Sequence, residues 1–388
     1  MVQMLIEENQ IDLSSIYIDG TKIEAYANRY SFVWRGSIEK YQEKLRIKVI
    51  ECLGLNENST AEEVLEVVRM FFNQIAKECT DKNIEFAYGQ GKRKHKLQRY
   101  YETLKDWKEK LEKYKEHLEI MGEHRNSYSK TDHEATFMRM KEDHMKNGQL
   151  KAAYNVQLAS ASGFIIGDNI SHHPSDMYTL KPFVRGLLEN YPNRLEKIVA
   201  DSGYESEENY VFLAEKGLNS YIKPSNYEKS KTRKYKKDME FRNSLIYDEK
   251  QDKYLSLDGK EFTRCKDKYR KRESGYVSIT KVYRCFDWNK EGEKTKGIYI
   301  SETFQKYREI SLKNIKSQQG IEERINRSIQ AEGAFSKLKD GLSYNRFHHK
   351  GKANAISEIN LLSIALNLNK LESKIIKKNL KIIKYKAA

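Results

Sequence analysis

Two apolar segments, 182 positions apart, each lead to an aspartate, and this pair of patterns most constrains the fold. In the first segment, side chains alternate as they do along a strand, so that Ile16 and Ile18 face one side and Tyr17 and Asp19 the other. The second segment, LEKIVAD, has the continuous apolar character of a buried strand and ends on Asp201. If these strands are neighbours in one sheet, the two aspartates lie side by side.

The order of the other patterns predicts the kind of sheet. LKAAYNVQLAS and GFIIGDNIS indicate an antiparallel strand pair, MYTLKPFVRGLLENY indicates an amphipathic helix, and another helix and strand follow Asp201. This order is typical of an α/β, ribonuclease-H-like fold: a mixed sheet with flanking helices, here with a helical-hairpin insertion and a β-rich insertion. The expected boundaries are 11–36, 131–222 and 301–372 for the core, 37–130 for the hairpin insertion, 223–300 for the basic β-rich insertion and 373–388 for a basic tail.

The hairpin insertion has clear helical signals. Thr60 and Glu63 match a capping box at the start of one helix. In a second, longer helix, apolar residues from Tyr100 to Met121 recur in steps of four and three, which is a heptad seam. We expect the two helices to pack as an antiparallel hairpin, or the seam to pair between chains. Its role is interpreted as a solvated projection without chemistry; the alternative is an arm that grips DNA or dimerises.

Composition indicates a polyanionic partner and excludes several classes of protein. The net charge of +15 and the pI near 9.2 favour nucleic acid, with a merely lysine-rich surface as the alternative. No run of 18 apolar residues predicts a transmembrane helix, and the segment MVQMLIEENQID lacks the features of a signal peptide. Four cysteines without a C-x-x-C pair predict reduced thiols in a cytoplasmic protein, with neither a disulfide framework nor a zinc site.

Three acids could form one metal site. Two-metal phosphoryl chemistry needs carboxylates around two divalent ions about 3.5–4 Å apart, and Mg²⁺ prefers hard oxygen ligands. We predict Asp19, Asp201 and Glu332, the last on a helix, as catalytic and metal-binding residues. Each also has a structural alternative: either aspartate could be a strand-end turn residue, and Glu332 a surface helix acid. The competing acids near the second strand are Asp132, Asp143, Asp168 and Asp176, of which Asp176 is expected to cap the following helix.

Basic residues near the third acid could contact phosphate. Lys339 follows Glu332 by seven positions, which places both on one helical face. Arg346, His349 and Lys350 form a basic turn after this helix and are predicted to bind the DNA backbone. A solvated lysine is the alternative for Lys339. Two histidine pairs, 172–173 and 348–349, could ligate a metal, but no spaced third partner accompanies either of them.

From about residue 15 to 372 the chain resembles the DDE transposases of bacterial insertion sequences, in particular the subgroup with a β-rich insertion before the last catalytic helix. The blocks that carry the resemblance are DGTKIEAYANRYSFVW, TDHEATFMRMKEDHMKNGQLKAAYNVQ, ADSGYESEENY and AEGAFSKLKDGLSYNRFHHKGKANAISEINLLSIALNLNKL. The resemblance implies Asp19, Asp201 and Glu332 as the catalytic triad and Lys339 as a phosphate-side lysine.

The implied activity is metal-dependent cleavage at a transposon end, followed by attack of the new 3′-hydroxyl on target DNA. The implied cofactor is Mg²⁺, with Mn²⁺ as a substitute and no zinc. The implied partner is double-stranded DNA, at transposon ends and target, with a homodimer as the active form, no membrane, and a cytoplasmic, nucleoid-associated location. Two alternatives stay open: a catalytically inactive, truncated remnant that only binds DNA, and a ribonuclease-H-like nuclease that hydrolyses without strand transfer.

The chain departs from the family pattern in three places. Only 18 residues precede Asp19, where the family has a helical DNA-binding leader of roughly a hundred residues, so we expect the carboxyl-terminal part of a transposase or a decayed copy. The β-rich insertion lacks the cysteine pattern that related members carry. A related signature places Tyr and Arg where this chain has Ile325 and Ser328. Arg327 is one residue out of that register and is not included in the predicted site.

Overall fold

The computed structural model describes residues 1–140, 148–288 and 295–377. The chain forms two compact units, which we call the sheet unit (Met1–Ile23 and Tyr154–Ala388) and the arm unit (Glu24–Ala153). Asp143, one of the competing acids, lies outside the described residues, and so does most of the expected basic tail, residues 378–388. The first residues of that tail, up to Ile376, continue helix α11 (Lys352–Ile376).

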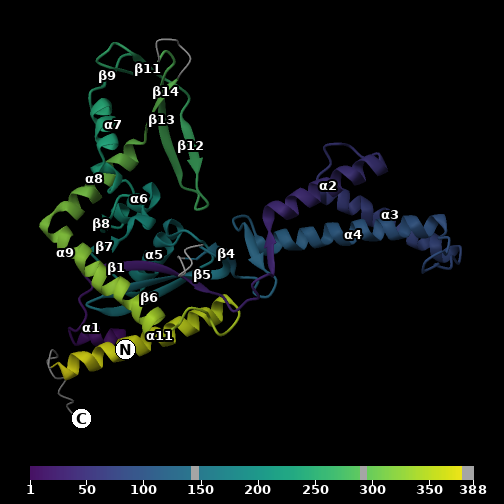
Figure 1. Ribbon diagram of the computed structural model, residues 1–388, viewed down its shortest axis with the longest axis horizontal. Coiled ribbons are helices and arrows are strands. Elements are labelled where there is room, and N and C mark those ends of the chain that lie inside the picture. The colour runs from purple at the N-terminus through teal and green to yellow at the C-terminus, as the bar shows by residue number, and fades with distance from the viewer. Residues whose placement is uncertain (141–147, 289–294, 378–388) are drawn as a thin grey trace. The chain divides into compact units, whose positions relative to one another are not determined.

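In the main sheet, the two strands that lead to the predicted aspartates are neighbours, as expected. Strand β1 (Ser15–Glu24) lies between β5 (Leu150–Ala161) and β7 (Lys197–Ala200), and β8 (Asn219–Ile222) follows β7. β6 (Phe164–Ser171) pairs antiparallel with β5, whereas β1, β7 and β8 are parallel, and β4 (Thr136–Arg139) pairs with the start of β5 (Figure 1). This mixed sheet with its flanking helices confirms the predicted ribonuclease-H-like fold class.

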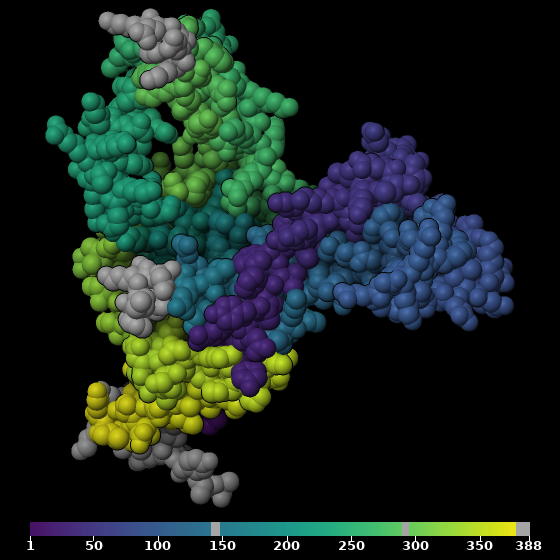
Figure 2. Space-filling view, turned by 45° about the vertical axis from the view of Figure 1, so that its right-hand side comes forward, coloured from purple at the N-terminus to yellow at the C-terminus, as the bar shows by residue number. Residues whose placement is uncertain are grey.

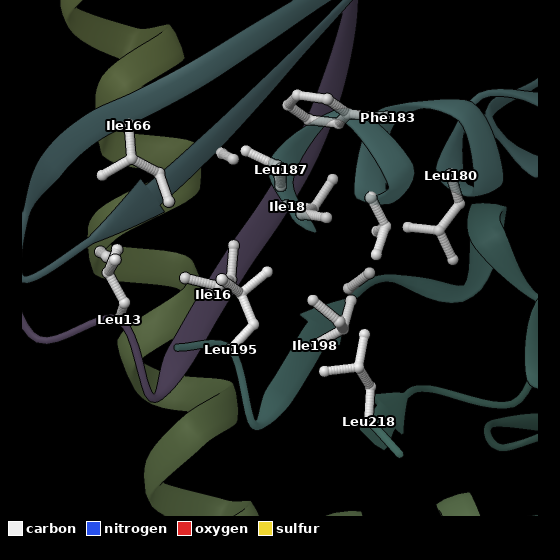
Figure 3. Packing of buried hydrophobic residues seen from close by; sticks show 14 of the residues in the cluster. Leu13, Ile16, Ile18, Ile166, Leu180, Phe183, Leu187, Leu195, Ile198 and Leu218 are labelled. Carbon is white, nitrogen blue, oxygen red and sulfur yellow. The ribbon is translucent and has the colours of Figure 1, made fainter. Parts of the chain in front are cut away.

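The alternation along β1 separates two cores. Ile16 and Ile18 are fully buried, with Ile198 of β7, against helices α5 (Leu180–Asn190) and α6 (Glu207–Glu215), as Figure 3 shows for the α5 residues. Tyr17 lies in a different cluster, with residues of β7, β8 and the carboxyl-terminal helices. Because alternate residues share a face, Asp19 belongs to the Tyr17 face. Each buried isoleucine contributes about 1.5–3 kcal/mol to this arrangement.

The helices on the Tyr17 face form an interrupted run. It consists of α8 (Glu302–Lys316), α9 (Gln318–Arg327), the π-helical η4 (Ser328–Glu332), α10 (Gly333–Ser336) and the π-helical η5 (Lys337–Gly341). The turn from α8 to α9 requires a glycine, because a Cβ on Gly320 would lie 1.9 Å from the carbonyl oxygen of Asn314. This close approach sets the direction in which α9 leaves α8.

The β-rich part of the sheet unit is a second sheet. After η3 (Lys229–Lys231) and α7 (Arg233–Asn243), its strands are β9 (Ile246–Asp248), β10 (Lys253–Leu255), β11 (Glu261–Arg264), β12 (Lys268–Lys271), β13 (Val277–Cys285) and β14 (Lys296–Ile300). These strands pair antiparallel, and a small aromatic core around Phe262 and Tyr283 packs beneath them. The turn at Gly259 has the positive φ of +79° that favours glycine.

The described part of the arm unit contains three helices rather than the two that the sequence predicts. They are α2 (Arg35–Leu53), α3 (Ala61–Asp81) and α4 (Lys96–Met121), and a short pair of strands, β2 (Phe32–Trp34) and β3 (Ser127–Ser129), lies where the helices begin and end. The capping box at the start of α3 is confirmed. Arg69 contacts Glu112, and Glu62 contacts Lys115, so α3 and α4 run antiparallel and the hairpin is formed within the chain (Figure 1). In the space-filling view of Figure 2, the purple and blue residues of the arm unit pack against one another.

The heptad seam supplies the core of the arm unit. Leu104, Trp107 and Leu111 of α4 are buried with apolar residues of α2 and α3. Among the described residues, no helix is both long and apolar enough to cross a membrane.

Candidate active site

Asp19 lies on β1, and Asp201 directly follows β7, the strand that pairs with β1. The parallel register of β1 and β7 joins Ser15 to Lys197, Ile16 to Ile198 and Tyr17 to Val199. Asp19 comes two residues after the last of these pairs on β1, and Asp201 comes two residues after it on the β7 side, so the two aspartates follow the paired residues at equal spacing. Asp19 is 8% exposed, and its Oδ1 accepts a hydrogen bond of 2.9 Å from the backbone N–H of Gly20.

Asp201 has a local structural role as well. It directly follows β7 and caps the 3₁₀ turn η2 (Ser202–Tyr204), where its Oδ1 accepts a 2.8 Å hydrogen bond from the N–H of Gly203. One carboxylate oxygen of Asp201 therefore has the role of a strand-end turn residue, which was the structural alternative for this acid. Capping also fixes the orientation of the carboxylate at the end of β7, so this role is compatible with metal binding.

Glu332 lies at the end of η4 and is held by its own helix. The guanidinium of Arg327 donates to Oε1 at 2.6 Å, and the hydroxyl of Ser328 donates to Oε2 at 3.1 Å. The other guanidinium nitrogen, Nη1, is 3.9 Å from Oδ1 of Asp19. Arg327 therefore lies between the acid of the strand and the acid of the helix, and links them electrostatically.

The π-helical geometry explains why Arg327 is absent from the predicted site. A π-helix forms i to i+5 hydrogen bonds, so the residue five positions before Glu332 lies about one turn away, where an α-helix places the residue four positions before. An arginine that is out of register by one residue in sequence is thus brought to the acid in space. The sequence signal for Arg327 is its position one residue before the arginine of the related signature, an offset that a π-bulge in the helix would accommodate.

A second residue that the sequence did not predict joins the helix to both strands. Glu323 of α9 is 6% exposed, and its carboxylate accepts hydrogen bonds from Ser15 Oγ at 2.8 Å and from the hydroxyl of Tyr17 at 2.6 Å. Lys197 Nζ, on the neighbouring strand, is 3.5 Å away. The sequence does contain a signal for such a residue. Ser15, Tyr17 and Asp19 occupy alternate positions on β1, and a strand face with polar groups that becomes buried needs a polar partner on the helix that covers it.

Asp176 does not cap the following helix, so that prediction was wrong. It begins the 3₁₀ turn η1 (Asp176–Tyr178), and its Oδ1 accepts hydrogen bonds from the side chains of Asn155 at 2.8 Å and Gln157 at 3.0 Å. The carboxylate lies beside both predicted aspartates. A Cβ on Gly20 would lie 2.9 Å from its Oδ1, and a Cβ on Gly203 would lie 3.1 Å from its Oδ2.

A buried phenol reports on the charges around it. Tyr204 is fully buried and donates a hydrogen bond to Oε1 of Gln157. Burial raises the pKa of Tyr204 well above its ordinary value, and nearby charges modify this effect. The acids that raise it further are Asp176, Asp19 and Asp201, and the base that opposes them is Arg327. Three carboxylates and one guanidinium therefore act electrostatically on the same buried phenol.

The predicted phosphate-side residues fall in two places. Lys339, on η5, donates to Thr21 Oγ1 at 2.6 Å and to the carbonyl oxygen of Lys22 at 3.2 Å, so it reaches β1 just beyond Asp19. Arg346, His349 and Lys350 are exposed on the turn before α11, on either side of the buried Phe347. The lysine thus contacts the strand of the first acid, whereas the other three residues lie on a surface turn.

The turn before α11 is fixed by Glu358. Its carboxylate accepts hydrogen bonds from the hydroxyl of Tyr344 and from the backbone N–H groups of His348 and His349, and lies 2.8 Å from Nδ1 of His349. Burial alone would raise the pKa of Glu358, but these hydrogen bonds lower it. The basic side chains are thus presented from an ordered turn.

Oxygen donors for a divalent ion are present, but they do not form a closed cage. Asp19, Asp176 and Asp201 each carry carboxylate oxygens, which are the kind of ligand that Mg²⁺ prefers. Within residues 1–140, 148–288 and 295–377, no three His, Cys, Asp or Glu side chains form a group that could hold a metal. Glu332 is instead bonded to Arg327. His173 pairs with Glu273 at 3.5 Å.

Comparison with known proteins places the carboxyl-terminal region in a family. Residues 257–372 match the family model described as "Transposase DDE domain", a stretch that includes Glu332 and Lys339 and excludes both aspartates. No curated protein and no solved structure matches the chain. This match supports the resemblance to the DDE transposases that the sequence predicted.

Proposed function

We propose that this protein catalyses metal-dependent DNA cleavage at transposon ends and transfer of the cleaved strand into target DNA. The observation that supports the proposal is the parallel pairing of β1 and β7, the strands that lead to Asp19 and Asp201, together with the packing of Ala331, next to Glu332, on Tyr17 and Val199 of these strands. A transposase of the DDE family acts on DNA, and the net charge of +15 suits that partner.

Asp19, Asp201 and Glu332 would hold the metal, Mg²⁺ or Mn²⁺ as a substitute. A bound divalent ion supplies Lewis-acid stabilisation of charge that develops on a phosphodiester. The chain's own residues orient the reaction. The pairing of β1 and β7 and the cap on η2 fix the aspartates, Arg327 holds the carboxylate of Glu332 toward Asp19, and the ammonium group of Lys339 neutralises a phosphate oxygen near Asp19.

The DNA contacts, the domain boundaries and the assembly belong to the same proposal. Arg346, His349 and Lys350 contact the DNA backbone from the turn that Glu358 holds. The core consists of 11–36, 131–222 and 301–372, with the two insertions between its parts. The active form is a homodimer on double-stranded DNA, located in the cytoplasm with the nucleoid.

Calorimetry of Mn²⁺ binding, with a short DNA duplex present, tests the site before any cleavage assay. We expect Asp201→Asn to lose most of the Mn²⁺ binding that the wild-type chain shows. Glu196→Gln is the matched control, because Glu196 is an exposed acid just before the opposite end of β7. Equal binding by wild type and Asp201→Asn would refute the metal site.

Product analysis then separates strand transfer from hydrolysis. With Mn²⁺ and a labelled duplex that carries a transposon end, the proposal predicts molecules in which the 3′-hydroxyl end is joined to target DNA. Nicked products without joined molecules would instead identify a hydrolytic nuclease. DNA binding without either product would identify an inactive remnant.

A further inference from the structure

The end of the arm unit differs in charge from the rest of its longest helix. We call residues 86–101, the loop after α3 and the first turns of α4, the tip. The tip contains five Lys or Arg residues and no Asp or Glu, whereas residues 102–119 of α4 contain six acidic and five basic residues. A local excess of one charge in an otherwise balanced helix indicates a surface for a partner of opposite charge.

Most cations of the tip have no acidic partner. Lys94 pairs with Glu102, but among the described residues no ion pair is found for the others, which are exposed: Lys92, Arg93, Lys96 and Arg99. Along the rest of the helical pair, five cations of the described residues have acidic partners: Arg69, Lys82, Lys105, Lys110 and Lys115. We call residues 102–119 of α4 the shaft. Among the described residues, three of the five shaft cations therefore have an acidic partner, whereas only one of the five tip cations has one.

The loop of the tip is held in a defined conformation. The amide side chain of Gln98 is fully buried, donates to the carbonyl oxygen of Ala87 at 2.9 Å and accepts from the N–H of the same residue at 3.0 Å. Phe86 packs on Tyr101 with ring centroids 5.1 Å apart, and Tyr101 packs equally close to Phe72 of α3. An ordered loop loses less conformational entropy when it binds, so its cations form a better contact surface than a flexible run of the same charge.

We propose that the tip is a DNA-contact surface, separate from the acids, which binds the phosphate backbone of duplex DNA without reading its sequence. Four exposed cations suit a row of phosphates, and the exposed side chains of Tyr88 and Tyr100 add hydroxyl donors of the kind that contact phosphate and sugar. The choice of DNA as the polyanion rests on the proposed function. The contact itself needs neither the acids nor a metal.

The position of the tip on its helix makes it a distinct contact. α4 has 26 residues, so its first residue lies about 38 Å from its last, at a rise of 1.5 Å per residue. This length exceeds one helical turn of B-DNA, which is about 34 Å. A contact made only at the tip therefore engages a different stretch of backbone from any contact made at the base of the arm.

The salt dependence of DNA binding by the full chain, measured by fluorescence anisotropy with EDTA present, tests this proposal. The tip variant carries Lys92→Gln, Arg93→Gln, Lys96→Gln and Arg99→Gln. The slope of log Kobs against log salt changes by about 0.9 for each phosphate that the protein no longer neutralises, so we expect it to become shallower by about 2–4. The shaft variant, with Lys105→Gln, Lys110→Gln, Lys113→Gln and Lys115→Gln, removes the same amount of charge from later residues of α4 and should keep a slope nearer that of wild type.

Each outcome has a distinct meaning. If the tip variant keeps the wild-type slope, or if both variants change the slope equally, the tip is not a specific DNA contact. Either result leaves the proposed cleavage activity unaffected. If the tip variant loses binding to single-stranded RNA but keeps binding to duplex DNA, the proposal is also wrong, because the partner of the tip is then RNA. If the wild-type chain itself does not bind DNA, the proposed function fails together with the tip. Far-ultraviolet circular dichroism checks that both variants stay helical.

Discussion

Strands β1 and β7 hold their acids through backbone pairing, whereas the helical run from α9 to η5 holds Glu332 and Lys339 through side-chain contacts. On the strand side, Asp19 lies on β1 and Asp201 directly follows β7, and these two strands pair in parallel over the residues that precede the acids. On the helix side, Glu332 depends on Arg327 and Ser328, and Glu323 anchors the helix to the strands. The strand side is therefore rigid by topology, and the helix side is adjustable.

The largest effect that we predict is the loss of cleavage when the side chain of an acid on the strand side is lengthened. Asp201→Glu keeps the charge but moves the carboxylate by about one methylene, and a misplacement of about 1 Å can cost 10²-fold. We expect cleavage to fall by about 10²–10³-fold in Asp201→Glu, but only about tenfold in Glu332→Asp, because Arg327 can follow a helix acid. Single-turnover cleavage rates measure both; equal reductions would contradict the comparison.

The anchor between the two sides should contribute strongly to stability. Glu323→Ala leaves the buried hydroxyl of Tyr17 without its acceptor and Lys197 without its partner, so we expect the free energy of unfolding to fall by about 2–4 kcal/mol. Urea unfolding measures the change. Glu322→Ala is the control, because Glu322 is exposed on the same helix and should change stability by less than about 0.5 kcal/mol. Equal effects would mean that Glu323 does not anchor the helix.

The strand side could be predicted from sequence more fully than the helix side, for a physical reason. Alternation and strand order are local patterns, so the sheet order and the placement of Asp19 and Asp201 on neighbouring strands could be predicted. The path of the helical run could not, because two π-helical segments change the spacing of its faces. The prediction for Asp176 fails for a similar reason: its partners, Asn155 and Gln157, come from a strand about twenty residues away, and a cap is the usual local choice.

Asp168 of β6 is an acid of the main sheet that is not among the predicted catalytic residues, so it should affect stability without affecting metal binding. Burial raises the pKa of Asp168 to about 6. The folded state then binds a proton more tightly than the unfolded state, so stability falls as pH rises from about 4 to about 6 and is level above that range. Because the group keeps some solvent, we expect a loss of about 1–2 kcal/mol.

Asp168→Asn removes the ionisable group and should therefore raise the free energy of unfolding at pH 7.5 while leaving it unchanged at pH 4. Thermal unfolding at the two pH values measures the difference. Destabilisation at pH 7.5 would show that the Asp168 carboxylate has a favourable partner in the folded protein. Mn²⁺ binding should be the same as in wild type, since Asp168 lies outside the predicted acids.

The smallest effect concerns the link between the two sides. Arg327→Lys keeps one positive charge but loses the planar fork that reaches Glu332 with one nitrogen and Asp19 with the other. Since the Glu332 side chain is half exposed, the change should cost about 1 kcal/mol, or about fivefold in cleavage rate. Arg324→Lys, one turn earlier on α9, is the matched control and should have little effect. In Arg327→Lys, the penalty for Glu332→Asp should also shrink, because the side chain that follows the shortened acid is already gone. If the two substitutions are instead independent, Glu332 is positioned by its helix alone, and the helix side is as rigid as the strand side.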